Sequence, residues 1–181
     1  EEMADVVFTH GGTIDKFIGD AVMVIFGAPE TMDTPEQARR ATACGLDMQA
    51  ALERLNGKWV PRGIEPRQIR VGLHTGSAVV GNFGSARRVD YTAIGETVNL
   101  ASRIESHGKP GQILMSRSTA DLLPAEAVED AGEYKLKGIE GSVRLYRARP
   151  AACSEPRAHQ HAPEPGDPEQ FAHSTLRQRR G

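Results

Sequence analysis

Residues 12–26 read Gly12-Thr-Ile-Asp-Lys16-Phe-Ile-Gly-Asp20-Ala-Val-Met-Val-Ile-Phe26 and predict a β-hairpin. The segments Thr13–Phe17 and Ala21–Phe26 are rich in β-branched and aromatic residues, which favour strands. Gly19 lies between them, and a residue without a Cβ allows the backbone to turn tightly. The sequence therefore predicts two strands joined by a turn at residues 18–20.

Two charged side chains stand out on this hairpin. The turn presents Asp20 at the hairpin tip, where a hard cation can reach its carboxylate. Lys16 lies on an otherwise apolar strand, where an ammonium needs a partner. A β-turn with a solvated lysine and aspartate explains both residues just as simply, so the hairpin by itself assigns no chemistry.

Helical and strand patterns alternate along the rest of residues 1–150. Thr34-Pro35-Glu36-Gln37 has the composition of a helix start, with Thr at the N-cap, and this helix is predicted to end at Asn56-Gly57. A second helix is predicted over Glu96–Ser106. We expect an α+β fold, with helices packed on one mixed or antiparallel sheet. The remaining predicted elements are strands over Ile69–His74, Ala78–Val80, Val89–Ile94, Gln112–Ser116, Gly132–Leu136 and Val143–Arg147, a turn at Gly81–Gly84, and a short helix over Ser118–Leu122.

Composition excludes several classes of protein. The 181 residues carry 22 Lys and Arg against 24 Asp and Glu, and a net charge of −2 argues against a generally basic nucleic-acid-binding protein. The longest apolar run, Ala21–Phe26, is too short to cross a bilayer, and no signal peptide is visible. Cys44 and Cys153 make no disulfide framework, which favours a reducing compartment. We expect a cytoplasmic protein.

The composition changes near Pro150 and divides the chain into two parts. Residues 1–150 form the predicted folded domain. Residues 151–181 are rich in proline and histidine and poor in large apolar residues, which predicts a disordered tail or linker. The chain begins with Glu1-Glu2, within what reads as the end of a helix, so we expect a piece of a longer protein.

The second predicted helix carries polar groups of a kind that bind nucleotides. Asn99 and Arg103 are four residues apart, so an amide and a guanidinium project from one face. A planar guanidinium beside an amide suits a phosphate next to a sugar, although a solvated helix face is an equally simple interpretation. Lys135 and Lys137 flank Leu136, so both ammoniums lie on one side of a strand.

Taken together, these segments closely resemble the catalytic domains of class III nucleotidyl cyclases. The resemblance runs from about Phe8 to Tyr146, and its motifs keep their order and spacing. It implies a ferredoxin-like α+β fold, and Thr92 resembles the bacterial subclass that includes soluble adenylyl cyclases. The motifs are Gly12–Phe26, Val71-Gly-Leu-His-Thr-Gly76, Val80-Gly-Asn-Phe-Gly-Ser85, Asp90-Tyr-Thr-Ala-Ile-Gly-Glu-Thr-Val-Asn99-Leu-Ala-Ser-Arg103 and Lys137-Gly138.

The resemblance implies a role for six residues. By it, Asp20 is the second of two metal-binding aspartates, and Lys16 and Thr92 are the pair that reads the base. Asn99 orients the ribose, Arg103 stabilises the transition state and Lys137 binds the triphosphate. Two Mg²⁺ or Mn²⁺ ions and a head-to-tail homodimer, with each site composed of residues from both protomers, are implied in the same way.

The base-reading pair favours ATP over GTP. Adenine offers an acceptor at N1 and a donor amino group at N6. A lysine ammonium only donates and a threonine hydroxyl can accept, so Lys16 and Thr92 suit adenine, whereas guanine would call for an acidic residue at position 16. The implied activity is that of an adenylate cyclase, which converts ATP to 3′,5′-cyclic AMP and pyrophosphate.

One part of the family pattern is missing. The first metal-binding aspartate of the family lies on a strand well upstream of the second, and only nineteen residues precede Asp20. Asp5 lies too near Gly12 to replace it, and Asp15 is expected to alternate away from Lys16. We therefore expect this chain by itself to be impaired. The alternatives are a non-catalytic nucleotide-binding or dimerisation module and, more remotely, a guanylate cyclase.

Overall fold

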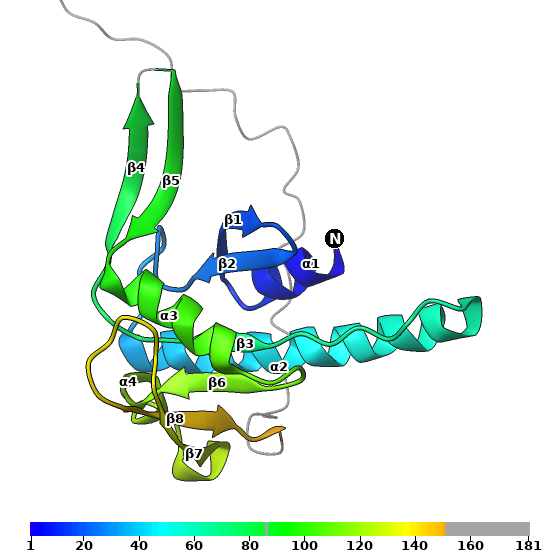
Figure 1. Cartoon of the computed structure of the whole chain (residues 1–181). Helices are drawn as coiled ribbons and strands as arrows, with labels where there is room; N and C mark the ends of the chain where they lie inside the picture. Colours follow the sequence, from blue (N-terminus) through cyan, green and yellow to red (C-terminus); the bar gives the residue numbers. More distant parts are fainter. Residues whose placement is uncertain (86, 151–181) are drawn as a thin grey trace, which may run out of the picture.

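The computed structural model describes residues 1–85 and 87–150, and in this part of the chain helices pack beside three small β-sheets (Figure 1). The predicted α+β class is confirmed, and the predicted tail lies outside the described residues. The helices are α1 (Glu2–Thr9), α2 (Thr34–Trp59), α3 (Glu96–His107) and α4 (Arg117–Ala120), with 3-10 turns η1 (Val60–Arg62) and η2 (Ala125–Ala127). The strands are β1 (Thr13–Ile18), β2 (Ala21–Ile25), β3 (Val71–Leu73), β4 (Val79–Ser85), β5 (Arg88–Ile94), β6 (Ile113–Ser116), β7 (Val128–Tyr134) and β8 (Val143–Ala148).

The strands form three hydrogen-bonded groups, where the sequence predicted one sheet. β1 pairs with β2 and β4 with β5, both antiparallel, and the four-stranded sheet has the order β3-β6-β8-β7. Within that sheet β3 runs parallel to β6, and the other pairs are antiparallel. Among the described strands none pairs with the second edge of β2 or of β3, so the hydrogen-bond ladders end there and the single-sheet prediction is wrong.

The first hairpin forms as predicted and carries an irregularity that the sequence did not reveal. Gly19 adopts a φ of +64°, the left-handed conformation that favours glycine in a tight turn. The register shifts between Ile14 and Lys16, which marks a β-bulge at Asp15. Such a bulge interrupts the alternation of side chains between the two faces of a strand. Asp15 and Lys16 therefore need not point to opposite sides.

Helix α2 begins and ends elsewhere than predicted. Its N-cap is Asp33, which has extended dihedral angles (φ −66°, ψ 150°) and whose carbonyl accepts the first helical hydrogen bond, so Thr34 is already helical. At the other end the helix continues through Asn56 to Trp59. The Asn56 amide does not break the helix because it exchanges two hydrogen bonds with the backbone of Arg67, at 2.7 and 2.8 Å. This contact ties the segment that follows α2 back onto the helix.

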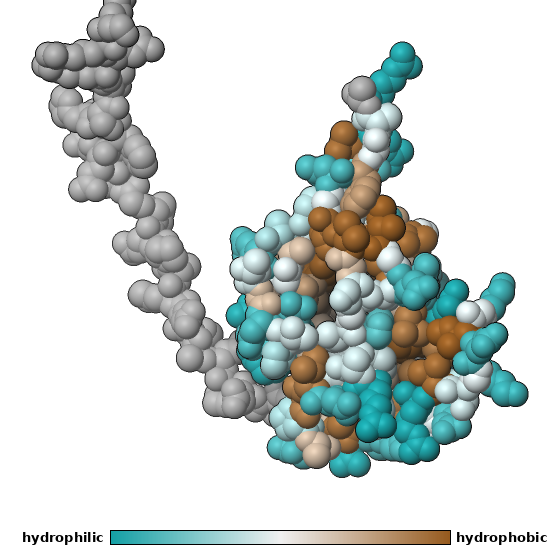
Figure 2. All heavy atoms as spheres, turned by 90° about the vertical axis from the view of Figure 1, so that its left-hand side faces the viewer, coloured by the Kyte–Doolittle hydropathy of each residue, from teal (hydrophilic) through white to brown (hydrophobic). Residues whose placement is uncertain are grey.

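Strands β4 and β5 form a long arm that projects from the body (Figure 1). The predicted turn at Gly81–Gly84 is wrong: these residues are part of β4 and pair with β5 from Thr92 to Val89. Buried and exposed side chains do not alternate clearly along the arm. Apolar side chains such as Val79 and Val89 are exposed there. Figure 2 shows hydrophobic atoms gathered along the arm and where it joins the body.

The core lies between the helices and the four-stranded sheet. Ile104 of α3 packs against Leu114, Leu136 and Leu145, and a second group surrounds Ile113 and Met115. A third group joins α1, α2 and the first hairpin around Val7, Cys44 and Met48. Burial raises the pKa of the Cys44 thiol to about 11, which agrees with the predicted packing role. None of the helices in the described residues has the length and apolar character to cross a membrane.

One glycine sets how closely α3 approaches the sheet. Gly72 lies at the centre of β3, and a Cβ at this position would overlap the backbone of α3 at Ala101 and Glu105. The contact is backbone against backbone, so no flexible side chain can move aside. Since α3 carries Asn99 and Arg103, the position of both side chains depends on this approach.

We predict that Gly72→Ala destabilises the domain by about 1–3 kcal/mol, the usual cost of overpacking. The measurement is urea unfolding followed by circular dichroism. Gly57→Ala is the matched control: Gly57 lies on α2 with no atom within 4 Å of the added Cβ, so alanine there stabilises the helix by up to about 1 kcal/mol. Equal stability of the two variants would contradict the close-approach argument.

Candidate functional site

A polar contact joins the first hairpin to the foot of the arm. Lys16 Nζ of β1 donates to Thr92 Oγ1 of β5 at 3.0 Å, across 76 positions of sequence. Thr92 is buried, and 44% of the Lys16 side chain is exposed. The Lys16 ammonium was expected to need a partner, and that partner is Thr92, the residue that the family resemblance paired with it.

Asp15 also takes part in this contact. The prediction that its side chain alternates away from Lys16 is therefore wrong. Its Oδ2 accepts the Thr92 hydroxyl at 2.7 Å and the Ala93 backbone N–H at 3.0 Å. Its Oδ1 lies 3.2 Å from Lys16 Nζ. The β-bulge at Asp15 is the reason, because it turns two consecutive side chains toward β5. The sequence offered one signal for this arrangement, namely that Asp15 and Lys16 are an adjacent acid and base on a strand that is otherwise apolar.

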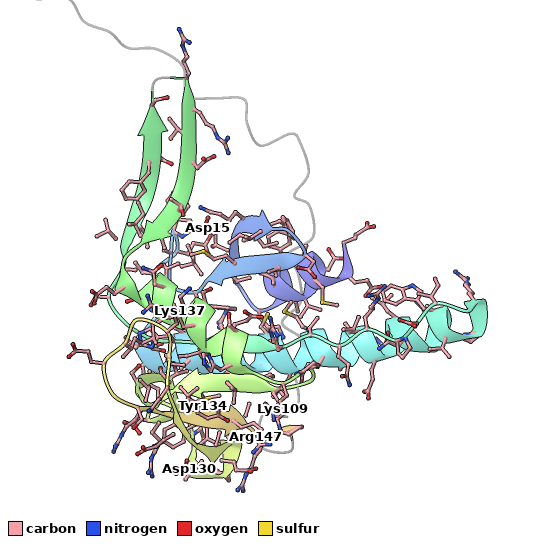
Figure 3. The ribbon with its side chains drawn as sticks, in the orientation of Figure 1. Asp15, Lys109, Asp130, Tyr134, Lys137 and Arg147 are labelled. Atoms are coloured by element: carbon pink, nitrogen blue, oxygen red, sulfur yellow. The ribbon has the colours of Figure 1, made fainter. Side chains whose placement is uncertain are left out.

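The Asp15 side chain is fully buried yet ionised. Burial alone raises the pKa of this carboxyl, but the hydrogen bonds from Thr92 and Ala93 and the Lys16 ammonium outweigh it and hold the pKa below its ordinary value of 3.8. Figure 3 shows Asp15 between the first hairpin and the foot of β5. The group is a buried charge whose Oδ2 accepts two hydrogen bonds, whereas Oδ1 accepts none and is paired only with the Lys16 ammonium.

A cavity of about 400 Å³ opens beside this contact. Lys16 and Thr92 line it together with Asn99, so the structure brings three of the predicted site residues to one place. β5 leads into α3 through Gly95, which connects the strand bearing Thr92 to the helix bearing Asn99. The other lining residues are Ala93, Ile94 and Val98, which give the cavity an apolar wall.

Arg103 and Lys137 do not line the cavity. An added Cβ at Gly138 would be 3.4 Å from Arg103 Nη2, so the loop after β7 runs along α3 at the level of this guanidinium. Lys137, which precedes Gly138, is exposed, and Figure 3 shows it in the loop beside α3. The loop that carries Lys137 therefore lies next to Arg103, which is one helical turn after Asn99 on α3.

Asp20 is separate from this group. It is exposed at the turn between β1 and β2 and does not line the cavity. Its carboxylate contributes, after the hydrogen bond and charge of Glu105, to raising the pKa of Arg70 at the entrance to β3. Within residues 1–85 and 87–150, no three His, Cys, Asp or Glu side chains gather as a metal site. Asp20 is thus an exposed carboxylate at the hairpin turn, outside any such group among the described residues.

Comparison with known proteins identifies the family. The family model described as adenylate and guanylate cyclase catalytic domain matches residues 4–148. The chain belongs to this family. The family prediction made from the motifs is confirmed.

Individual relatives agree with this assignment. The chain is 42% identical over 146 residues to Adenylate cyclase 1 of Rhizobium meliloti, covering 79% of this chain but only 22% of that relative. Among solved structures, the adenylyl cyclase CyaB from P. aeruginosa has a TM-score of 0.77 at 40% identity, covering 82% of this chain and 76% of the other. The guanylyl cyclase Cya2 has a TM-score of 0.76, also at 40% identity, covering 87% and 78%.

We predict that Lys16→Met destabilises the cyclase domain by about 1–2 kcal/mol at pH 7, because the buried Asp15 carboxylate loses its cation. The expected loss is smaller than for a fully buried pair because Lys16 is partly exposed. Lys58→Met, at the last turn of α2, is the matched control and should change stability by less than about 0.5 kcal/mol.

The pH dependence of this loss gives a second readout. Asp15 has a depressed folded-state pKa, so its stabilising contribution is full above 3.8 and is lost as the pH falls through the lower folded value. Without Lys16 that pKa is less depressed, so Asp15 of the variant protonates at a higher pH than Asp15 of the unmodified chain. The difference in stability between the two should therefore shrink as the pH falls below 3.8. A stability difference that grows as the pH falls below 3.8, measured by urea unfolding, would refute this account.

Proposed function

We propose that the chain is the catalytic domain of an adenylate cyclase, which forms 3′,5′-cyclic AMP and pyrophosphate from ATP in intracellular, cytoplasmic signalling. The observation that carries the proposal is the hydrogen bond from Lys16 to Thr92 at the mouth of a cavity shared with Asn99. The ammonium donates, as adenine N1 requires, and the hydroxyl can accept from the N6 amino group. The likeness to named adenylate cyclases supports the same substrate.

The rest of the nucleotide fits along α3. With the base against Lys16 and Thr92, the ribose reaches Asn99, one turn before Arg103 on the same helix. The phosphates then extend toward the Arg103 guanidinium and Lys137, whose positive charges suit a triphosphate. In the proposed reaction, the 3′-hydroxyl attacks the α-phosphorus in line and pyrophosphate leaves. Arg103 meets charge that develops at the α-phosphate in the transition state.

Members of this family depend on divalent metal ions, and Asp20 would hold Mg²⁺ or Mn²⁺ here. A carboxylate at an exposed turn is the hard oxygen ligand that these ions prefer, so the residue fits the role. When bound, the ions would lower the pKa of the 3′-hydroxyl and neutralise charge on the phosphates. Two ions are proposed for the complete site, and the described residues offer a single candidate carboxylate at the turn.

A head-to-tail homodimer is part of the proposal. Asp20 does not line the cavity that holds the base-reading pair, which supports a composite site with the metal ligand of one protomer facing the cavity of its partner. The exposed apolar side chains on the first hairpin and the arm, among them Phe17, Ile18, Val79 and Val89, would be covered in such a dimer. A symmetric pair then has two equivalent sites.

We also propose that the chain by itself turns over slowly. One metal-binding aspartate of the family pattern has no counterpart here, and β2 and β3 each keep an unpaired edge among the described strands. A strand between these edges would complete the sheet and bring a second carboxylate close to Asp20.

The first test measures cyclic AMP formation from ATP and Mn²⁺ by two proteins. One is this chain, and the other carries an added N-terminal strand with an aspartate, taken from a related cyclase domain. We expect activity in the extended protein and little in the chain itself, with Asp20→Asn abolishing the activity of the extended form. ATP binding without turnover in both would favour the alternative, a non-catalytic nucleotide-binding or dimerisation module. Preference for GTP would favour a guanylate cyclase, as in the similar Cya2.

Arg103→Ala should lower kcat of the active form by several hundred-fold, since one preorganised donor is worth about 3–4 kcal/mol. ATP affinity should change much less, because the arginine acts on transition-state charge. The measurement is kcat against ATP dissociation constant, with Arg54→Ala on the exposed face of α2 as the matched control. An unchanged kcat would remove Arg103 from the mechanism.

A further inference from the structure

The Thr92 hydroxyl is surrounded by groups that fix the direction of its proton. It donates to Asp15 Oδ2 at 2.7 Å and accepts from Lys16 Nζ at 3.0 Å. A hydroxyl has one proton and two lone pairs, so one lone pair is left for a ligand. Its other donor contact, with the Ala93 carbonyl, is longer at 3.4 Å and shares the residue whose N–H already binds Asp15.

A threonine alone does not distinguish adenine from guanine. Its hydroxyl can rotate, accepting from the N6 amino group of adenine or donating to the O6 carbonyl of guanine. With the proton held by Asp15, only the accepting state remains. Adenine N6 then finds an acceptor, whereas guanine O6 would face the lone pair of a hydroxyl that has no proton to offer.

We propose that Asp15 is a specificity-determining positioning residue, which selects ATP over GTP by holding the Thr92 proton away from the base. The inference rests on the proposed function, because it concerns the base that the same cavity accepts. The side chain of Asp15 is fully buried, so it acts through Thr92 and Lys16 rather than by touching the nucleotide. Its hydrogen bond from the Ala93 backbone N–H fixes the carboxylate in the orientation that Thr92 requires.

The acceptor and the charge of Asp15 have separable effects. The acceptor orients the Thr92 hydroxyl and so sets the base preference. The charge holds the Lys16 ammonium 3.2 Å away and so affects the binding of any nucleotide. Asp15→Asn keeps an oxygen that can accept from Thr92 and Ala93 but presents an amide N–H₂ to Lys16. Asp15→Ala removes both functions.

The test compares the affinities of ATP and GTP for the full chain, measured as displacement of a fluorescent ATP analogue in the presence of Mn²⁺. In the unmodified chain ATP should bind more tightly. Asp15→Ala should reduce the ratio of the two affinities by about tenfold, within the range that a lost base-edge contact gives. Asp15→Asn should lower the affinities for both nucleotides but keep their ratio within about threefold of that of the unmodified chain. Asp121→Ala, an exposed aspartate at the end of α4, is the matched control and should change neither.

The outcomes separate this proposal from the proposed function. If the unmodified chain binds neither nucleotide or prefers GTP, the proposed function is wrong and this inference falls with it. If the unmodified chain prefers ATP and Asp15→Ala keeps that preference, the role of Asp15 alone is overturned. The role is also overturned if Asp15→Asn reduces the affinity ratio as much as Asp15→Ala does. The charge of Asp15, and not its ability to accept from Thr92, would then determine the base preference.

Thermal unfolding of each variant shows whether it folds. If Asp15→Ala does not, Asp15→Ser takes its place, since a serine keeps the position polar while its rotatable hydroxyl leaves the Thr92 proton free to turn. The serine variant should then show the reduced ratio, and an unreduced ratio would overturn the proposal. A purely structural role for Asp15 would lower both affinities together and leave their ratio unchanged.

Discussion

A buried carboxylate holds the first hairpin against the foot of the arm. Asp15 loses its water on folding, and an ionised group in that position is costly unless other donors replace the water. Thr92 and Ala93 of β5 supply two hydrogen bonds, and the ammonium of the neighbouring Lys16 supplies an opposite charge. The requirement to satisfy one charge therefore fixes how two sheets that share no hydrogen-bond ladder lie relative to each other.

The rest of the site follows from that attachment. β5 passes through Gly95 directly into α3, so fixing Thr92 also fixes the start of the helix that carries Asn99 and Arg103. Gly72 fixes the far part of the helix by admitting its backbone close to β3. The cavity is thus bounded by β1, β5 and α3, and the contacts of Asp15 and Gly72 hold these elements in place. Such a rigid wall suits the proposed role of holding a base in one orientation.

Short-range patterns predicted much of this structure, and irregular geometry accounts for what they missed. The first hairpin and α3 were predictable because a turn glycine and a repeating pattern of apolar residues determine the structure of the segment that contains them. The β-bulge at Asp15 was not predictable, since the alternation rule assumes regular strand pairing. The strand at Gly81–Gly84 was not predictable either, because glycines usually mark turns but here pair with β5. The contact of Lys16 with Thr92 joins residues far apart in sequence, and the family motifs rather than the local pattern predicted it.

The geometry divides the proposed function between what one protomer can do and what requires two. Lys16, Thr92 and Asn99 share a cavity within a single chain, and the proton of Thr92 is oriented by Asp15 of that same chain. Asp20 lies outside that cavity. In the proposed function, base selection is therefore a property of the protomer, whereas a second chain brings the metal ligand to the phosphates. An isolated protomer would still prefer the correct nucleotide, and dimerisation would supply turnover without altering that preference.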